Sequence, residues 1–360
     1  MTDPTGTKSG ARVLSCIQPT AAIHIGNYFG AIQNWVAMQH VYDCVYGVVD
    51  FHAMTAPYHR EELAQNTYDM LIALMACGVD ARASRLFVQS FVPEHTELCW
   101  ILATVCGYGE LARMTQFKDK SRQLRAKTES DAVDGAGVTA GLFLYPVLQA
   151  ADILAYRPEV VPVGRDQKQH LELCRSIARR FNQQYRRAVF PEPATVFTKV
   201  PKVMSLTQPD RKMSKSLGEQ NYVGIFDPPE VVRKKIRASV TDSGDVKAER
   251  TSPGVANLLT ILEAAGESDR VIEMRDEYRL GRLKYVHLKD AVAEALIALF
   301  RPMRERREEL HAKFKGPSSE WFCELSQNAR SLAVETLEQA RDAAGLIGFD
   351  CRFTKPTTAF

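Results

Sequence analysis

The chain has 360 residues, of which 45% are hydrophobic and 25% are charged, and its formal net charge is +3. This length supplies two or three domains' worth of core, and so small a net charge argues neither for nor against a nucleic-acid partner. No apolar run approaches the length of a bilayer crossing, and the polar start MTDPTGTKSGA has no signal-peptide core. We therefore expect no membrane partner.

Cysteine usage points to a reducing compartment. None of the eight cysteines forms a CxxC pair, and several lie inside apolar runs. We expect buried, reduced thiols of a cytoplasmic protein, and neither a zinc site nor a disulfide framework. The eight are Cys16, Cys44, Cys77, Cys99, Cys106, Cys174, Cys323 and Cys351.

The first half of the chain alternates short β-rich runs with helical patterns. Such alternation predicts βαβ units around a buried parallel sheet, which is an α/β fold. The predicted strands are 13–17, 44–49, 86–88 and 160–163, and the predicted helices are 25–39, 61–77, 97–117 and 166–181.

Two later regions break this alternation. Residues 118–139 read KDKSRQLRAKTESDAVDGAGVT, and this charged, glycine-containing stretch predicts a flexible surface insertion. After the strand-like Val203–Leu206 the pattern becomes helical, which predicts a mostly helical second half. Its expected helices are 229–240, 254–265, 267–280, 289–314 and 318–344.

A first candidate motif follows the first predicted strand, in CIQPTAAIHIGNYFG (16–30). Ligands of an open parallel sheet bind at the carboxyl ends of strands, where helix N-termini offer N–H groups. His24 and Asn27 lie three apart, so they share a helix face, and both can donate to phosphate oxygens. Gly26 lacks Cβ and would let a flat ring approach the backbone. Alone, such a match is more often an ordinary helix start.

A second candidate motif is RKMSKSL at 211–217. Lys212 and Lys215 bracket Met213 and Ser214, and Ser216 follows. Two lysines and two hydroxyls in one short loop would form a clamp for a polyphosphate, although a single such stretch is usually a solvated turn. Both motifs in this order across one α/β domain are much more specific than either alone.

Together the two motifs are similar to the signature of class I aminoacyl-tRNA synthetases. Residues 13–348 resemble the bacterial tryptophanyl-tRNA synthetases, in which Asn at the fourth position of the first motif is frequent. The segments that carry this resemblance include SCIQPT, DFHAM (50–54), GELARMTQFKDK (109–120), YPVLQAADIL (145–154) and VTDSG (240–244).

The resemblance implies a Rossmann-like parallel-sheet catalytic domain with a mostly helical C-terminal domain. Residues 1–205 would form the catalytic domain, with a connective insertion at about 93–143. Residues 206–317 would hold the KMSKS loop and a helical anticodon-binding domain. Residues 318–360 would form a C-terminal helix and tail that pack back on the catalytic domain.

Asp152 lies on a helical apolar segment, where a carboxylate is costly unless it has a partner or a function. If Asp152 has a purely structural role, it forms a salt bridge or caps a helix. By the resemblance it selects tryptophan by accepting the indole N–H, a donor-only group. A wrong amino acid would leave it unpaired, which can reject that substrate by roughly 10⁴-fold without an editing domain. The other positions that match the tryptophan pocket are His52, Tyr145, Gln149, Val161, Val163 and Gln167.

Several site positions depart from the family pattern. Leu14 and Gln149 stand where other members often have Phe and Met, which changes the expected packing against the indole. Arg165 replaces a common Glu and would contact ATP through its backbone.

The resemblance assigns catalysis to the two motifs, through His24, Asn27, Lys212, Ser214 and Lys215. Asp166 would accept from the ATP ribose hydroxyls, and Val203 would meet the adenine through its backbone. Lys118 and Lys120 are candidates for the phosphates, or plain surface lysines. The full implied ATP set is Gln18, Pro19, Thr20, Gly26, Asn27, Gly164, Arg165, Asp166, Val203, Lys212, Met213, Ser214, Lys215 and Ser216.

The implied reaction is ATP-dependent attachment of L-tryptophan to tRNA(Trp) through a tryptophanyl-adenylate, with release of AMP and pyrophosphate. The attacking carboxylate is already ionised at neutral pH, so catalysis needs positioning and charge stabilisation and no general base. Mg²⁺ would accompany ATP as its counter-ion, with no zinc site. No cysteine lies between Cys174 and Cys323, so we expect no iron–sulfur cluster.

The implied macromolecular partners are tRNA(Trp) and a second copy of the chain. Basic stretches at 230–239 and 304–307 are candidates for tRNA phosphates, although a basic helix face is often only solvated. The homodimer surface is placed at Pro93–Met114, which includes Trp100; internal core would give the same pattern.

Three alternatives stay open at this stage. Tyrosyl-tRNA synthetases share the fold and motifs, but the AAD and DFHA segments favour tryptophan. An adenylyl-transferring ligase that uses no tRNA is disfavoured by the long helical half. A non-enzymatic tRNA-binding paralogue would typically lack phosphate-binding residues, whereas His24, Asn27, Lys212 and Lys215 are all present.

Overall fold

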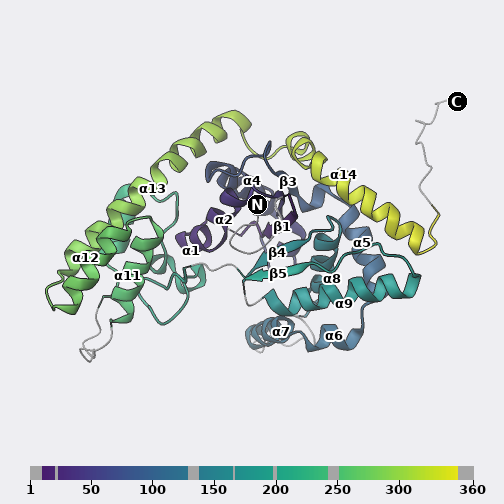
Figure 1. The fold of residues 1–360 in the computed structure, drawn as a ribbon, viewed down its shortest axis with the longest axis horizontal. Helices are drawn as coiled ribbons and strands as arrows, with labels where there is room; N and C mark the ends of the chain where they lie inside the picture. The colour runs from purple at the N-terminus through teal and green to yellow at the C-terminus, as the bar shows by residue number, and fades with distance from the viewer. Residues whose placement is uncertain are drawn as a thin grey trace.

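The computed structural model describes residues 10–20, 23–128, 138–164, 167–197, 201–241 and 251–347. Its centre is one five-stranded sheet in the order β3-β2-β1-β4-β5, and every neighbouring pair is parallel (Figure 1). The predicted α/β fold with a parallel sheet is therefore confirmed. The strands are β1 (Arg12–Ile17), β2 (Asp43–Val48), β3 (Arg85–Val88), β4 (Val160–Val163) and β5 (Ala194–Phe197).

Helices cover both faces of the sheet, and the strand sequences explain why. Along β2, Cys44 and Tyr46 face one hydrophobic cluster and Val45 faces the other, as the two-residue period of a strand requires. Because both faces are buried, the strand reads as a continuous apolar run. The helices of this half are α1 (Ile25–Asn27), the π-helical turn η1 (Tyr28–Ile32), α2 (Gln33–Met38), α3 (Asp50–Ala53), α4 (Arg60–Ala76), the 3₁₀ turn η2 (Gln89–Phe91), α5 (Glu94–Ala103), α6 (Tyr108–Arg113), α7 (Thr115–Thr128), α8 (Ala140–Leu154) and α9 (Lys168–Tyr185).

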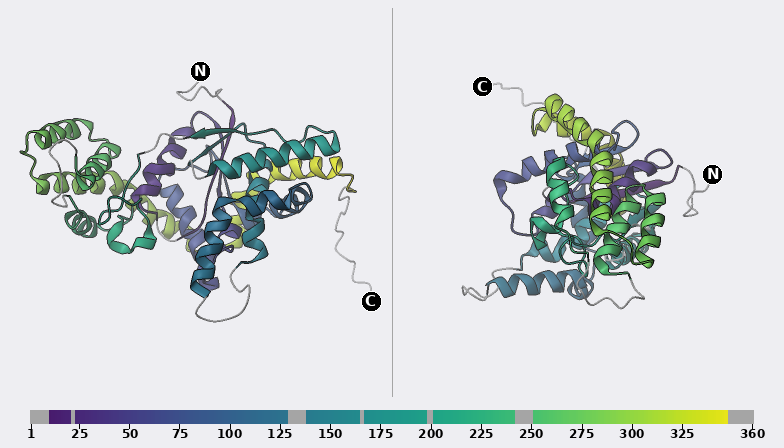
Figure 2. Two further views of the ribbon diagram at one scale, coloured as in Figure 1. Left: turned by 90° about the horizontal axis from the view of Figure 1, so that it is seen from below. Right: turned by 90° about the vertical axis from the view of Figure 1, so that its left-hand side faces the viewer.

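From Pro229 onward, the described residues are mostly helical, as the sequence predicts. The chain after β5 contains the short turns η4 (Lys215–Leu217) and η5 (Glu219–Asn221) and the helices α10 (Pro229–Arg237), α11 (Pro253–Ala264), α12 (Ser268–Arg279), α13 (Tyr285–Phe314) and α14 (Ser319–Ala343). Helices α10 to α13 form a lobe to one side of the sheet, and α14 runs back along the other side (Figures 1 and 2).

Helix α13 connects this lobe to the sheet half. Its buried residues Leu288, Val292, Leu296 and Phe300 recur every four positions, so they share one helix face. The Phe300 ring packs edge-on against Tyr28 from the first helical segment, with 5.1 Å between ring centroids. The helical lobe is thereby packed directly behind the corner that carries the first motif.

Helix α14 lies against the edge strand β3 and helix α5. The Ser326 hydroxyl accepts a hydrogen bond of 3.0 Å from the backbone N–H of Val88 at the end of β3. Arg330 pairs with the buried carboxylate of Glu94 at the start of α5. The helix therefore covers one of the two open edges of the sheet, which would otherwise expose unpaired backbone groups.

Some sequence predictions are wrong. The helix predicted at 97–117 is three separate helices, because the chain turns after Ala103 and restarts at Gly107, whose N–H donates to Glu110. Residues 118–128 of the predicted flexible insertion belong to α7, since Lys, Arg, Gln and Ala there are strong helix formers and Phe117 packs on Phe143. Residues 129–137 lie outside the described residues.

Two short strand assignments also differ. The strand-like Val203–Leu206 makes only a single antiparallel bridge, between Met204 and Lys212, and is not part of the sheet. The four-residue β5 was not predicted, because ATVF lies among prolines that mask a run so short.

None of the helices in the described ranges combines the length and apolarity that a bilayer crossing requires.

Gly47 of β2 provides a test of how tightly the sheet is packed. A Cβ at this position would lie 2.2 Å from the buried ring of Phe87 on the neighbouring strand. Gly47→Ala is therefore expected to lower the free energy of unfolding by about 1–3 kcal/mol, measured by urea denaturation. Gly30→Ala is the matched control, since a Cβ there meets no atom within 4 Å. Equal effects of the two substitutions would contradict this packing.

Candidate active site

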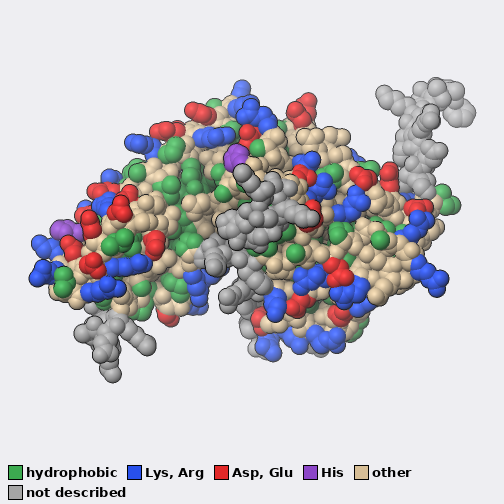
Figure 3. All heavy atoms as spheres, viewed as in Figure 1, with side chains coloured by type: hydrophobic (Ala, Val, Ile, Leu, Met, Phe, Trp, Pro, Cys, Tyr) green, Lys and Arg blue, Asp and Glu red, His purple; other side chains and the backbone are tan. Residues whose placement is uncertain are grey.

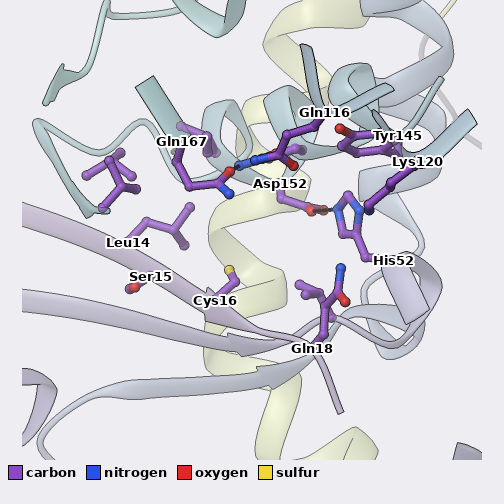
Figure 4. A pocket seen from close by; sticks show the side chains of 15 residues that line it. Leu14, Ser15, Cys16, Gln18, His52, Gln116, Lys120, Tyr145, Asp152 and Gln167 are labelled. Carbon is purple, nitrogen blue, oxygen red and sulfur yellow. Dashed lines mark hydrogen bonds and ion pairs between the residues drawn. The ribbon is translucent and has the colours of Figure 1, made fainter. Parts of the chain in front are cut away.

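A pocket lies at the carboxyl ends of the central strands. It has a volume of about 390 Å³ and opens where β1 and β4 are neighbours, at the point where the strand order reverses (Figure 4). In an open α/β sheet this is the expected place for a ligand. The lining residues are Leu14, Ser15, Cys16, Gln18, Val49, His52, Gln116, Lys120, Tyr145, Gln149, Asp152, Ile153, Val161, Val163 and Gln167.

All seven residues that the sequence assigned to a tryptophan pocket line this one cavity. They come from α3, α8, β4 and the start of α9, elements that only the sheet brings together. Gln149 donates to Gln167 over 3.2 Å, and His170 hydrogen-bonds the Tyr145 hydroxyl over 2.9 Å. The ammonium of Lys120 lies 4.8 Å from the centre of the Tyr145 ring. Sequence reasoning missed Ser15, Cys16, Gln116, Val49 and Ile153, which carried no signal beyond ordinary core or loop.

Asp152 is the charged group at the base of the pocket, and its side chain is only 4% exposed. His52 Nε2 lies 2.7 Å from Oδ2, and Gln89 Nε2 donates to both oxygens over 2.8 and 2.9 Å. His95 Nδ1 lies 3.1 Å from Oδ1. Burial alone raises the pKa of this carboxyl, but the hydrogen bonds and charge interactions with His52 and His95 outweigh it and hold the pKa below its usual range. The site therefore contains a buried anion.

The first motif forms a reciprocal helix cap at the end of β1. The backbone N–H of Asn27 donates to His24 Nδ1 over 3.3 Å, and that of His24 donates to Asn27 Oδ1 over 3.2 Å. Because Nδ1 accepts, the neutral ring carries its proton on Nε2. A Cβ on Gly26 would lie 3.0 Å from the His24 ring, so in this structure the space over Gly26 is partly filled by that ring.

The second motif lies against the first. The chain segment 223–225 pairs with 23–25 through Ile25 N–H to Val223 O at 2.9 Å and Ile225 N–H to Ile23 O at 3.1 Å. Lys215 Nζ donates to the carbonyl of Thr20 over 2.9 Å. Two motifs far apart in the sequence thus form one corner, with both lysines near His24.

The electrostatics of this corner follow from its cations. Burial, reinforced by the charges of Lys215 and Lys212, lowers the pKa of His24 to about 4. Burial also lowers the pKa of Lys215 to about 8. At neutral pH, His24 is an uncharged N–H donor beside two ammonium groups, which is an arrangement suited to an anion.

The remaining motif residues hold the loop in shape. Ser214 caps the turn Lys215–Leu217, because its hydroxyl accepts from the Ser216 N–H over 3.3 Å and lies 2.9 Å from the Ser216 hydroxyl. Met213 is buried, and its N–H donates to the carbonyl of Val203 over 3.2 Å. Gln18 and Thr20 are exposed at the end of β1, with Pro19 buried between them, and Gly164 is exposed after β4. Arg165 and Asp166 lie outside the described residues.

Among the residues that the structure describes, no group of three or more His, Cys, Asp and Glu side chains is placed to hold a metal ion. The seven cysteines in those ranges are free thiols; Cys44, Cys77 and Cys174 are buried, whereas Cys323 is exposed and departs from the expectation.

A doubly wound sheet with an anion-binding corner beside a small-molecule pocket defines a nucleotide-binding α/β catalytic domain. Comparison with known proteins identifies the family within this class. The family described as tRNA synthetases class I (W and Y) matches residues 7–301. The chain therefore belongs to this family.

Individual relatives agree with this assignment. The tryptophan–tRNA ligase of Clostridium tetani is 41% identical over 338 residues, which is 93% of this chain and 96% of that protein. The one from Clostridium acetobutylicum is 41% identical over 93% of this chain and 97% of that protein. The crystal structure of tryptophanyl-tRNA synthetase from Campylobacter jejuni, complexed with ADP and tryptophan, matches with a TM-score of 0.78 and 33% identity over 93% of this chain and all of that one.

The unusual state of His24 can be measured. Its ring is expected to titrate near pH 4, and Lys215→Met is expected to raise the His24 pKa because it removes a nearby positive charge. The measurement is an NMR titration of the protein labelled with ¹⁵N-histidine. Lys284→Met, an exposed lysine before α13, is the control and should leave the His24 titration unchanged. A His24 pKa near 6.5 in the parent protein would refute this electrostatic description.

Proposed function

We propose that this protein is a tryptophan–tRNA ligase, which joins L-tryptophan to tRNA(Trp) through a tryptophanyl-adenylate and releases AMP and pyrophosphate. The observation that carries the proposal is the pairing of a buried carboxylate in a pocket of mixed polar and apolar lining with a cationic corner at the same edge of the sheet. Family membership, and relatives of this name at 41% identity over most of the chain, support it.

In the first step, the tryptophan carboxylate attacks the α-phosphate of ATP, and pyrophosphate leaves. The pocket positions the amino acid, while the corner receives the phosphates. His24, through Nε2–H, and Asn27, through its side-chain amide, offer neutral donors to the phosphate oxygens. Lys212 and Lys215 stabilise the charge on the departing pyrophosphate, so catalysis is mainly electrostatic.

Lys215 directs one of its three N–H donors to the Thr20 carbonyl, which leaves two donors for the phosphates. Lys120 lines the pocket from α7 and is a further candidate for the phosphates, whereas Lys118 does not line it. The ATP roles of Gln18, Pro19, Thr20, Gly164 and Val203 remain predictions supported by their placement around the corner.

Mg²⁺ fits this corner only as a companion of ATP. The donors gathered there are ammonium groups, amides and hydroxyls, whereas Mg²⁺ prefers carboxylate and phosphate oxygens. The metal would supply charge neutralisation on the polyphosphate, held mainly by the phosphate oxygens themselves.

Asp152 selects tryptophan by accepting the indole N–H. Tyrosine and phenylalanine offer no donor at the position of the indole N–H, so they would leave the anion without that partner. His52 is the donor to Asp152 that lines the pocket, so the indole N–H shares Oδ2 with His52 or replaces it there.

The tRNA would be bound by exposed cations of the helical lobe. The basic stretch 230–239 contributes less than its sequence suggests, since Lys235 pairs with Asp227 and Arg237 with Asp290. Arg233 and Lys234 are exposed on α10 and are the better candidates. In the 304–307 stretch, Arg307 lies over the Phe226 ring and Arg304 donates to the carbonyl of Ile297. On the face in Figure 3, lysines and arginines of this lobe are mixed with acidic side chains.

Two assembly proposals complete this function. The homodimer would form through Pro93–Met114, where Trp100 and Tyr108 are 73% and 77% exposed on α5 and α6. Large apolar side chains at such exposure are typical of an interface.

We also propose the domain boundaries given above, after residue 205 and after residue 317. The packing of α14 on β3 and α5 supports the second boundary, since it places the C-terminal helix on the catalytic domain. A protein that acts on tRNA and whose described cysteines are free thiols fits a cytoplasmic location.

Amino-acid-dependent ATP–pyrophosphate exchange tests the proposed function directly. Exchange is expected with L-tryptophan alone among the twenty amino acids, and charging is expected with tRNA(Trp). Exchange with tyrosine instead would move the assignment to the other branch of the family. Exchange with none would leave only a tRNA-binding role.

Asp152→Asn tests the selecting carboxylate. An amide cannot accept from all the donors that face this group, so kcat/KM for tryptophan in the exchange assay is expected to fall roughly 10²-fold or more. Asp50→Asn is a matched control, because Asp50 is also a buried carboxylate but bonds only Ser90 and its own turn. If both variants retain parental activity and selectivity, Asp152 is not the selecting group.

A further inference from the structure

The carboxylate of Asp152 has a pocket side and a rear side. His52 contacts Oδ2 from the pocket side and lines the cavity with Asp152. Gln89 and His95 reach the carboxylate from the rear, and neither is among the residues that line the cavity. A ligand in the pocket can therefore meet His52 and Asp152 but not the two rear donors.

One of the two rear groups, His95, is oriented by a third side chain, Tyr156. Its hydroxyl lies 2.8 Å from His95 Nε2. If that hydroxyl donates, Nε2 is the acceptor, and the ring proton must lie on Nδ1, the atom that faces Asp152 Oδ1. Burial raises the pKa of Tyr156 well above its usual value, so the hydroxyl keeps its proton and can donate.

These three side chains are placed in the core, where polar groups are costly. Gln89, His95 and Tyr156 are each 0% exposed. Polar groups at such depth cost free energy unless they are paired. Here Gln89 and His95 face the Asp152 carboxylate, and Tyr156 reaches it only through His95. Gln89 turns its amide N–H towards both oxygens of Asp152, while its own carbonyl oxygen, buried among described residues, has no hydrogen-bond partner. Packing alone does not account for that arrangement.

The segment that carries Gln89 and His95 is fixed from outside. It leaves β3 at Val88, whose N–H is held by Ser326 of α14. It enters α5 at Glu94, which is held by Arg330 of the same helix. The rear donors therefore stand on a segment that is anchored at both ends.

We propose that Gln89, His95 and Tyr156 are positioning residues that hold Asp152 ionised and turn Oδ2 towards the pocket as the acceptor for the indole N–H. This inference rests on the proposed role of Asp152 in selecting tryptophan. Gln89 donates to both carboxylate oxygens, and His95 Nδ1 faces Oδ1 at 3.1 Å, an ion-pair distance that lies outside hydrogen-bond geometry in this structure. The rear of the carboxylate is thus covered by two nitrogen-bearing side chains, and its pocket side is left for exchange between His52 and a ligand.

The test compares L-tryptophan with 3-(benzothiophen-3-yl)-L-alanine, in which sulfur replaces the indole N–H. The readout is the ratio of kcat/KM for the two amino acids in ATP–pyrophosphate exchange. In the parent protein this ratio is expected to be roughly 10² or more. Tyr156→Phe is expected to lower the ratio about fivefold and His95→Leu about tenfold, because each weakens the hold on the acceptor.

A purely structural role would not change this ratio, since a loosened core lowers kcat/KM for both amino acids alike. Tyr46→Phe is the matched control, because Tyr46 is a fully buried tyrosine whose hydroxyl donates to the Trp35 carbonyl outside the site. His95→Asn places an amide N–H near the position of Nδ1 and is expected to restore much of the ratio lost in His95→Leu.

The outcomes separate this inference from the proposed function. A parental ratio near one would refute the role of Asp152 and the inference with it. A high parental ratio that Tyr156→Phe and His95→Leu leave unchanged, while lowering both activities as Tyr46→Phe does, would overturn the inference alone. Equal loss of the ratio in His95→Leu and His95→Asn would also overturn donation by His95.

Discussion

The burial of one carboxylate constrains the whole amino-acid site. Asp152 lies at the base of the cavity, where an unpaired charge would be too costly to keep. Its partners come from α3, from the turn after β3 and from the first turn of α5, and Asp152 itself belongs to α8. Those elements can meet only if β1, β2, β3 and β4 are neighbours in the observed order. The fold is therefore what makes a stable buried anion available to a ligand.

A second constraint is electrostatic: the buried carboxylate and the cationic loop occupy different parts of the site. In the proposed function, the anion at the base of the pocket binds a donor group, while the lysines of the 211–217 loop bind phosphates at the end of β1. Burial, reinforced by the neighbouring charges of Lys215 and Lys212, lowers the pKa of His24 and keeps its ring neutral, so it can donate without adding charge. Under this proposal, an anion would meet the amino acid's indole N–H and cations would meet the nucleotide's phosphates.

Much of the fold and of the candidate site could be predicted from the sequence, and the predictions that were wrong or missing have physical causes. The parallel sheet followed from its apolar runs, and Asp152, His52 and Tyr145 followed from resemblance. Gln89 and His95 could not be found, because their only signal is a position behind Asp152 that the tertiary fold creates. Helix α7 was mistaken for a loop because its charges mark a solvated helix face as readily as disorder. The pairing of Lys235 and Arg237 likewise depends on partners distant in the chain.

The most direct test of the central claim observes the indole proton itself. Tryptophan labelled with ¹⁵N in the indole ring would be bound to the protein, and the N–H proton shift would be recorded by NMR. A hydrogen bond to the Asp152 carboxylate predicts a marked downfield shift in the parent protein that is reduced in Asp152→Asn, since bonds to charged acceptors are short and strong. An indole proton shift that is the same in both proteins would contradict the claim that Asp152 is the acceptor.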